Sequence, residues 1–327
     1  MITTLRKSTV LMMSIAAGVA AANTYYSQSI LQEIADFLSL SKSQAGIIPA
    51  FSVAGYGVGL FFLTPLGDRM DRKKLILITQ GMLVVVLLGI SLATTFWQIY
   101  ILAFFMGCLS ITAQLLIPMA AAMDAARRSK NIGMIATGLL TGMLGAHAVS
   151  DYVTMLFSWQ YVYAFSAFLL SATNTLLYLM LPSAEKRFDG SYREVLQSAL
   201  WQMKRFPRLR IRAILGALIF ATFCSLLTTL ILHLGGPPFN LQADTIGLFS
   251  FTGIAGVITT LLSPYPLSTL ILAIVLLDMG VRATQRTNLA TIYQLDERAH
   301  NRLNTIYMTT CSVGGGLGTL AGLAYWI

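Results

Sequence analysis

Long apolar stretches separated by short polar segments run along the whole chain. Six of them fall in the first half, at Thr9–Ile30, Gln44–Leu66, Leu75–Thr94, Gln98–Met123, Ile132–Leu156 and Trp159–Leu181. Four more follow, at Ala213–Leu234, Thr245–Leu262, Leu267–Thr287 and Asn304–Ile327. A helix of about 20 residues crosses the roughly 30 Å of hydrocarbon in a bilayer. Because backbone amides in hydrocarbon must find partners within their own segment, the pattern predicts an all-α polytopic membrane protein with about ten apolar segments.

The composition excludes an ordinary soluble domain. Hydrophobic residues make up 56% of the 327 residues and charged residues 11%, against about 45–50% and 25% in soluble domains. The three cysteines lie singly in apolar stretches, which does not fit a zinc site or a disulfide framework. The sequence also contains no metalloprotease helix motif and no phosphate-binding loop. We therefore expect no metal, no cofactor and no enzymatic activity.

The positive charge predicts a membrane topology rather than a nucleic-acid partner. The formal net charge is +9, and cytoplasmic loops of membrane proteins carry an excess of Lys and Arg. With a cytoplasmic N-terminus, the basic residues inside are Arg6, Lys7, Arg69, Arg72, Lys73, Lys74, Arg127, Arg128, Lys130, Lys186, Arg187, Arg193, Lys204, Arg205, Arg208, Arg210 and Arg212. Before the seventh apolar stretch only Lys42 falls outside.

A dense charged turn, Gly67-Asp68-Arg69-Met70-Asp71-Arg72-Lys73-Lys74, joins the second and third stretches. A cytoplasmic basic anchor would explain its Arg and Lys residues, but not the interleaved acids. The Asp-Arg-x-x-Arg-Lys core resembles the signature loop of the major facilitator superfamily, whose first bundle the six N-terminal stretches also follow. The resemblance implies a gating loop made of Asp68, Arg69, Asp71 and Arg72, with Asp68 as the gating acid and the two arginines as its ion-pair partners. Asp71 stands where the family has glycine.

The first stretch contains Asn23-Thr24-Tyr25-Tyr26-Ser27-Gln28, which resembles the Asn-x-Tyr-Tyr-x-Gln segment of sugar-efflux and drug-efflux-like members. Tyr25, Gln28 and Ser29 fall on one side of a helix. The candidate substrate-binding residues are Asn23, Tyr25, Tyr26, Gln28 and, in the fourth stretch, Gln114. The alternative is a tyrosine belt at the outer interface with amides that join helices, and for Gln114 an interhelical hydrogen bond.

Two ionisable residues inside apolar stretches are candidates for proton coupling. Asp278 lies about eleven residues into its stretch, roughly at mid-bilayer. A local pair with Arg282 is an equally good interpretation. His147 lies among small residues of the fifth stretch, where imidazole could relay protons or simply bond to neighbouring backbone. We expect Asp151, one turn further on, to be interfacial.

The domain organisation is predicted as a six-helix transmembrane bundle at 1–182, a cytoplasmic linker at 183–212 and an incomplete second bundle at 213–327. The resemblance implies two six-helix bundles. No charged loop follows the stretch at 245–262, so we expect about a helix and a half to be missing there, and a twelfth helix to be missing at the end.

Glycines four residues apart mark faces where helices can approach closely. The pairs Gly55 with Gly59 and Gly138 with Gly142 predict such packing in the first bundle. A third series runs from Gly314 through Gly318 to Gly322. Because we expect helices to be missing from the second bundle, we expect this last stripe to be left unpacked.

The function implied by the resemblance is secondary active transport. We expect efflux of a small molecule across the bacterial inner membrane by alternating access, with protons as the candidate coupling ion and the lipid bilayer as the surrounding partner. The alternative is a transport-inactive member of the same family, because the second half is short.

Overall fold

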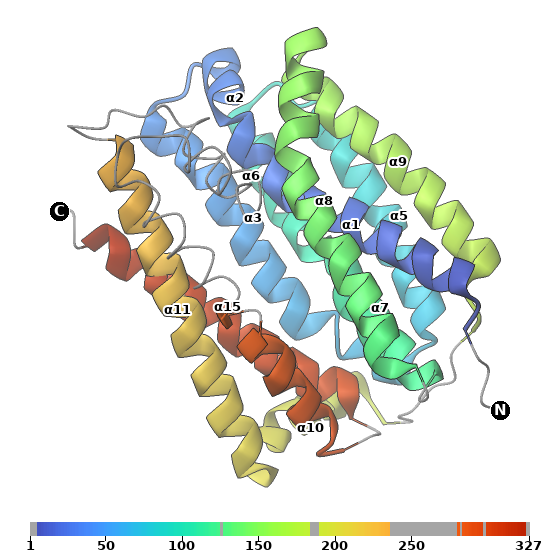
Figure 1. Cartoon of the computed structure of the whole chain (residues 1–327). Helices are drawn as coiled ribbons and strands as arrows, with labels where there is room; N and C mark the ends of the chain where they lie inside the picture. Colours follow the sequence, from blue (N-terminus) through green and yellow to red (C-terminus); the bar gives the residue numbers. More distant parts are fainter. Residues whose placement is uncertain are drawn as a thin grey trace, which may run out of the picture. The chain divides into compact units, whose positions relative to one another are not determined.

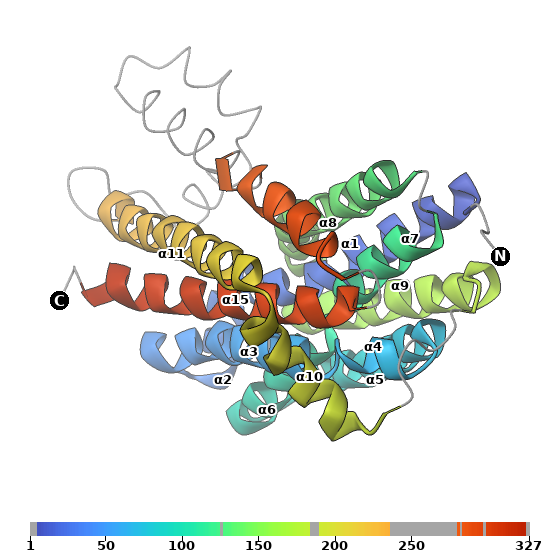
Figure 2. The same ribbon diagram turned by 90° about the horizontal axis from the view of Figure 1, so that it is seen from below.

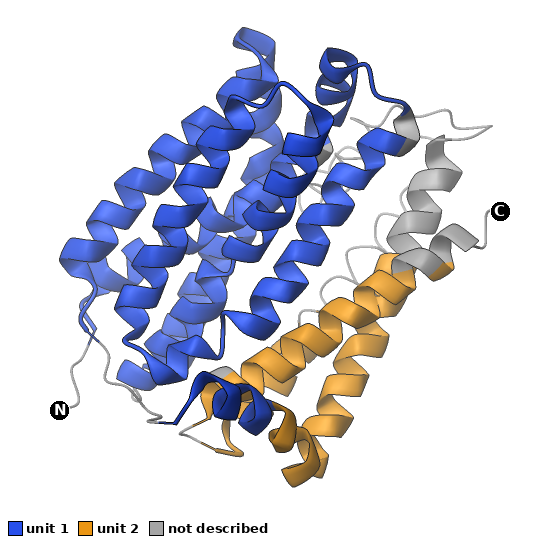
Figure 3. Cartoon of the chain, turned by 180° about the vertical axis from the view of Figure 1, so that it is seen from behind, with its two compact units in different colours: residues 1–199 blue, residues 200–327 orange. Residues whose placement is uncertain are grey.

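The computed structural model describes residues 5–124, 127–183, 190–235, 280–281, 283–296 and 299–324. Within this part of the chain all regular secondary structure is α-helical (Figure 1), which confirms the predicted all-α class. The chain divides into two compact units, Met1–Ala199 and Leu200–Ile327, shown in separate colours in Figure 3. The division between the two units falls inside the helix at Tyr192–Arg205, which belongs to the predicted linker. The predicted domain boundaries themselves stay a prediction.

Unit 1 contains five of the predicted membrane spans. Its helices are α1 (Lys7–Ser29), α2 (Leu31–Leu38), α3 (Lys42–Phe62), α4 (Leu66–Arg69), α5 (Arg72–Ser91), α6 (Phe96–Leu109), α7 (Thr112–Met123), α8 (Arg128–Leu156), α9 (Trp159–Met180) and the beginning of α10 (Tyr192–Arg205). Five helical stretches of the described chain are long and apolar enough to cross a membrane, at Gln44–Arg69, Arg72–Ser91, Phe96–Met123, Arg128–Leu156 and Trp159–Met180. Each overlaps a predicted span.

Side-chain caps explain where several helices begin. Ser41 and Gln44 form a reciprocal capping box at the start of α3, and Thr95 and Gln98 form another at the start of α6. These side chains satisfy backbone N–H groups that have no partner within the helix. The predicted fourth span is broken at Ser110, whose hydroxyl donates to the carbonyl of Met106 at 2.6 Å. This single predicted span therefore contains two consecutive helices, α6 and α7.

Large apolar side chains are exposed on the outer faces of the helices in unit 1. Examples are Val85 within α5, which is 69% exposed, Leu92 directly after α5, which is 79% exposed, and Phe168 in α9, which is 67% exposed. The interior is formed by residues such as Leu83, Tyr163 and Leu170, which are almost fully buried. Helices with apolar residues on both the inner and the outer face are typical of membrane-spanning segments.

Glycines set the closest helix contacts in unit 1, as predicted. A Cβ atom on Gly55 or Gly59 in α3 would overlap the carbonyl group of Phe104 or Cys108 in α6. In the same way Gly138 and Gly142 of α8 lie directly against the backbone of α1, including Gly18. The chain therefore depends on the absence of side chains at these two crossings.

Unit 2 consists of the rest of α10, α11 (Pro207–Gly235), a helical segment at 283–293 and α15 (His300–Ala324), seen from below in Figure 2. The Asn288 side chain connects three of these segments. Its Oδ1 accepts from the Arg212 guanidinium at 3.2 Å, and its Nδ2 donates to the Tyr307 hydroxyl at 3.3 Å. The ninth predicted span was expected to end at Thr287, but the helix continues to residue 293.

The expectation that the third glycine stripe is left unpacked is wrong. A Cβ atom on Gly314 would overlap Ala217 of α11, and one on Gly318 would overlap Ala221. The stripe on α15 thus packs closely against α11 within unit 2. The structure does not describe the surroundings of Gly322, and the stretch at 245–262 with its expected gap lies outside the described residues.

Alanine substitutions in α3 test the importance of these crossings. Gly55→Ala places a methyl group against the α6 backbone, and we expect it to lower the free energy of unfolding by about 1–3 kcal/mol, as overpacking does. Gly57→Ala is the matched control, because no heavy atom lies within 4 Å of its Cβ position. Thermal unfolding in one detergent, followed by circular dichroism, measures both variants. Equal midpoints would show that the α3–α6 crossing relaxes at no cost.

Candidate functional site

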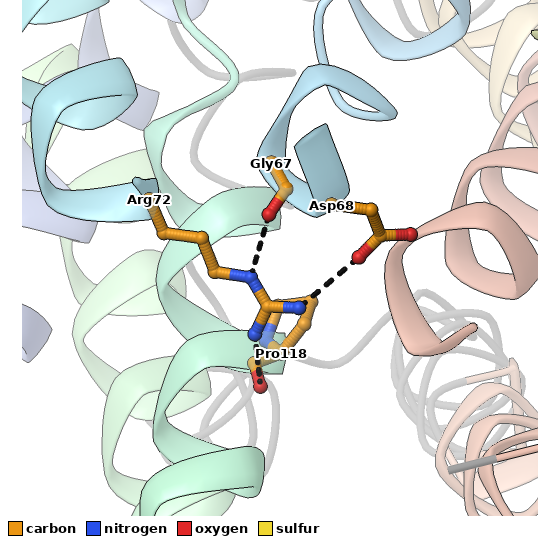
Figure 4. Close-up of polar contacts among 4 residues, drawn as sticks. All are labelled: Gly67, Asp68, Arg72 and Pro118. Atoms are coloured by element: carbon orange, nitrogen blue, oxygen red, sulfur yellow. Dashed lines mark hydrogen bonds and ion pairs between the residues drawn. The ribbon is translucent and has the colours of Figure 1, made fainter. Parts of the chain in front are cut away.

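The charged turn forms a buried polar contact between three helices of unit 1 (Figure 4). Asp68 in α4 is fully buried, and the side chain of Arg72 in the first turn of α5 is 3% exposed. The Arg72 guanidinium donates from Nη2 to Asp68 Oδ1 at 3.1 Å, from Nε to the Gly67 carbonyl at 2.9 Å and from Nη1 to the Pro118 carbonyl in α7 at 3.4 Å. One side chain therefore joins the turn to both α5 and α7.

The local sequence explains this geometry. The one-turn helix α4 ends at Arg69, and Met70 is extended. Asp71 then caps α5, because its carboxylate accepts from the Lys73 N–H at 2.9 Å. Asp71 thus caps the next helix, in which Arg72 is the first residue.

The predicted members of the turn have different surroundings. Asp68 and Arg72 form the expected ion pair. The Arg69 side chain is exposed, and it forms no ion pair with the described residues of the chain. Close by, the Tyr192 hydroxyl at the start of α10 donates to the Phe62 carbonyl at the end of α3 at 2.8 Å. Burial raises the pKa of Tyr192, so this hydroxyl keeps its proton.

The aromatic and amide residues of α1 divide between the interior and a polar cluster. Asn23 is fully buried and accepts from the Ser166 hydroxyl of α9 at 2.7 Å. Its own amide donates to the Val19 carbonyl at 2.9 Å. Tyr26 is packed in the apolar interior, edge-on to Tyr163. In the structure these two residues join α1 to α9. The bond of Asn23 agrees with the alternative in which amides join helices, whereas Tyr26 is packed in the interior and does not form part of a tyrosine belt. Their role in substrate binding stays a prediction. The side chain of Gln28 lies outside the described residues.

A second group of candidates meets between α1 and α8. Ser29 is hydrogen-bonded to Nδ1 of His147, and Tyr25 lies edge-on to the same imidazole with ring centroids 6.3 Å apart. Asp151, one turn along α8, is exposed and interacts electrostatically with His147. The structure thus brings together a predicted substrate residue, Tyr25, and a predicted proton-coupling residue, His147.

Gln114 contacts a residue that was not predicted. Its side-chain amide in α7 donates to the hydroxyl of Tyr56 in α3 at 3.2 Å. Nothing in the sequence distinguishes Tyr56 from the other tyrosines of the chain, and Ser166 is equally one of several hydroxyl residues in its helix. Asp278 lies outside the described residues, as does Arg282.

An open groove of about 670 Å³ lies between α8 and α9. It is lined by apolar and aromatic side chains, among them Tyr152, Leu156, Phe157, Tyr161 and Phe165. None of the predicted site residues lines it. The candidate site therefore consists of the buried turn and of the polar pairs inside unit 1.

The long apolar helices of unit 1 define a multi-pass membrane protein. The sequence model of the Major Facilitator Superfamily matches residues 13–277. The uncharacterized transporter YgaY of Escherichia coli O157:H7 is 33% identical, over 97% of this chain and 88% of that protein. The chain belongs to the Major Facilitator Superfamily.

Two solved structures share the fold. The human organic anion transporter MFSD10 (TETRAN) superposes with a TM-score of 0.69 at 13% identity, covering 97% of this chain and 93% of its own. A mutant of the nucleoside transporter NupG superposes with a TM-score of 0.62, also at 13% identity, covering 96% and 91%. At this identity the likeness extends to the fold alone.

Removal of one partner tests the buried ion pair. We expect Arg72→Gln to lower the free energy of unfolding by about 3–5 kcal/mol, because Asp68 is left charged and buried. The double variant Asp68→Asn with Arg72→Gln should recover part of that loss. Lys74→Gln, which removes an exposed charge from the same turn, should change the unfolding midpoint little. A double variant no more stable than the single one would contradict this account.

Proposed function

We propose that this chain is a secondary active transporter that exports a small molecule across the bacterial inner membrane by alternating access. The single observation that carries the proposal is the buried Asp68–Arg72 pair and its bond to the Pro118 carbonyl. A buried ion pair is a poor source of net stability, but losing one partner is costly. Such a contact is suited to hold one conformation until its partners are exchanged.

Membrane topology supports the placement of this contact. The excess of Lys and Arg in alternate loops favours a cytoplasmic position for the N-terminus and the charged turn. The turn then lies at the cytoplasmic end of α5 and α7, where a gate must close when the substrate site opens outward. Reporter fusions after Asp71 and Arg128 should accordingly be cytoplasmic, and one at Lys42 external.

The proton-coupling role is assigned to His147. Imidazole is the side chain whose ordinary pKa lies between pH 5 and 8. Its Nδ1 can accept from the Ser29 hydroxyl when neutral or donate to it when protonated, so the contact between α1 and α8 persists in both states. Asp151, exposed one turn further on, would receive protons from the outer side. Asp278 remains a second candidate.

The substrate region is assigned to the side chains that face one another inside unit 1. Tyr25 beside His147 and Gln114 beside Tyr56 offer aromatic surface together with hydrogen-bond donors and acceptors. Asn23 and Tyr26, which contact α9, would hold α1 in position beside this region. Because Tyr25 contacts His147, the substrate and the proton would bind at neighbouring sites. Such an arrangement suits a transporter that exchanges protons for substrate.

The gating role is tested in inverted membrane vesicles energised by ATP hydrolysis. Substrates are found first, as compounds of a panel that dissipate the proton gradient only when the wild-type chain is present. Asp68→Asn should then reduce the initial rate about tenfold at equal membrane abundance, because the contact that favours one conformation is lost. Lys74→Gln should keep the wild-type rate. A wild-type chain with no flux for any compound would favour the transport-inactive alternative.

The coupling role is tested by a pair of variants that separate titration from hydrogen bonding. His147→Asn keeps an amide near the position of Nδ1, so the bond to Ser29 can form, but it cannot titrate. Ser29→Ala removes the bond and keeps the imidazole. We expect the wild-type rate to change at least about threefold between about pH 5.5 and 8, and His147→Asn to abolish that change. Persistent pH dependence in His147→Asn would transfer the role to Asp278.

A further inference from the structure

The bend between α10 and α11 carries a surface that the proposed transport cycle does not use. We define the basic elbow as Leu200, Trp201, Lys204, Arg205 and Arg208, all of which are exposed and belong to unit 2. Figure 2 follows the chain through this bend, where α10 ends at Arg205 and α11 begins at Pro207.

The charge of the elbow is of one sign. Between Glu194 and Asp244 the sequence contains no acidic residue. Arg210 and Arg212 continue the basic run into α11, and Arg212 is bonded to Asn288. The exposed cations of the elbow therefore lie on a surface without local acidic neighbours in sequence, and anions are attracted to it.

Aromatic rings fix the position of Arg205. Its guanidinium lies 5.4 Å from the ring centre of Trp201 and 5.0 Å from that of Phe206. Asp296 approaches the same group at 3.8 Å, a long ion pair in which half of the arginine side chain stays exposed. Cation–π contacts of this kind orient the guanidinium. Arg205 is thus held in place while part of it remains accessible to a further anion.

The elbow lies where α11 would enter the hydrocarbon. From Ile211 onward α11 exposes a strip of apolar side chains, including Ile214 at 54% and Leu218 at 61%. Their spacing places them on one face of the helix, as expected for contact with lipid. Trp201 is itself 54% exposed and Leu200 50%. Tryptophan and basic residues next to a lipid-facing strip favour the headgroup region.

We propose that the basic elbow binds the headgroups of anionic phospholipids. Lys204, Arg205 and Arg208 contact the lipid phosphate, while Trp201 and Leu200 lie at the boundary with the acyl chains. The phosphate of a lipid is favoured over a soluble anion because apolar side chains occupy the same surface as the cations. The cytoplasmic leaflet is the one concerned if the proposed topology holds, but the binding itself requires neither that topology nor transport.

The main test measures lipid binding by native mass spectrometry of the full chain in detergent, with phosphatidylglycerol and phosphatidylcholine as probes. We expect a lower dissociation constant for phosphatidylglycerol. Loss of each charge should raise the dissociation constant about fivefold, which corresponds to about 1 kcal/mol. The triple variant Lys204→Gln, Arg205→Gln and Arg208→Gln should therefore raise it about a hundredfold. Lys74→Gln, Arg127→Gln and Lys130→Gln remove three exposed charges elsewhere and should raise it less than about twofold.

Two further measurements guard this test against misfolding and against a soluble ligand. The charge-preserving set Lys204→Arg, Arg205→Lys and Arg208→Lys should bind within about threefold of the wild type. Glycerol phosphate should not displace the lipid at lipid-like concentrations. The proposal is overturned if both glutamine sets weaken binding equally, if the charge-preserving set loses binding while it remains folded, or if glycerol phosphate competes as well as the lipid does.

The depth of the elbow is tested with brominated acyl chains in nanodiscs, because bromine quenches tryptophan fluorescence on contact. The quenched signal of the wild type should fall in Trp201→Phe, which keeps a ring beneath Arg205. The same quenched signal in both proteins would place Trp201 away from the acyl chains and overturn this part of the proposal. Nanodiscs have the same lipid in both leaflets, so the result does not depend on the orientation of the chain.

Discussion

Close approach of helix backbones is the constraint on which unit 1 depends. In a bilayer, helices gain little by burying apolar side chains against one another, since lipid tails are equally apolar. Association then relies on contact and on interhelical hydrogen bonds. Gly55 and Gly59 allow α3 to reach α6, and Gly138 and Gly142 allow α8 to reach α1. The hydrogen bond from Ser166 to Asn23 adds a polar connection between α1 and α9.

One polar contact of unit 1 lies at a glycine crossing, and others join further pairs of its helices. Ser29 meets His147 across the α1–α8 pair. Arg72 reaches the carbonyl of Pro118 only because α5 and α7 are adjacent. When a buried charge has several hydrogen-bond partners, any movement that breaks these bonds leaves polar groups unsatisfied and costs free energy. The candidate coupling residue His147 therefore lies on a helix that packs closely on α1, and the candidate gating residue Arg72 connects α5 to α7.

Arg72 and Arg205 differ in how far their side chains are buried, and this difference decides what each can bind. Arg72 is desolvated, and its guanidinium donates hydrogen bonds to three oxygen atoms of the protein. Arg205 lies at the surface against two aromatic rings, with a weak pair to Asp296. The first arrangement is specific and costly to break. The second leaves charge available for an external anion, which is why the lipid proposal rests on the elbow and not on the turn.

The sequence by itself determined five apolar spans of the described chain, the all-α class and the family resemblance, because hydropathy and local charge patterns are properties of consecutive residues. The family resemblance also implied the Asp68–Arg72 pair, whose members are four residues apart. Only the tertiary structure decided that Asn23 bonds to Ser166, that Tyr56 is the partner of Gln114, and that the Gly314 stripe packs on Ala217. Those contacts join residues distant in sequence, and one polar or small residue in a span looks like another until the neighbouring helix is known.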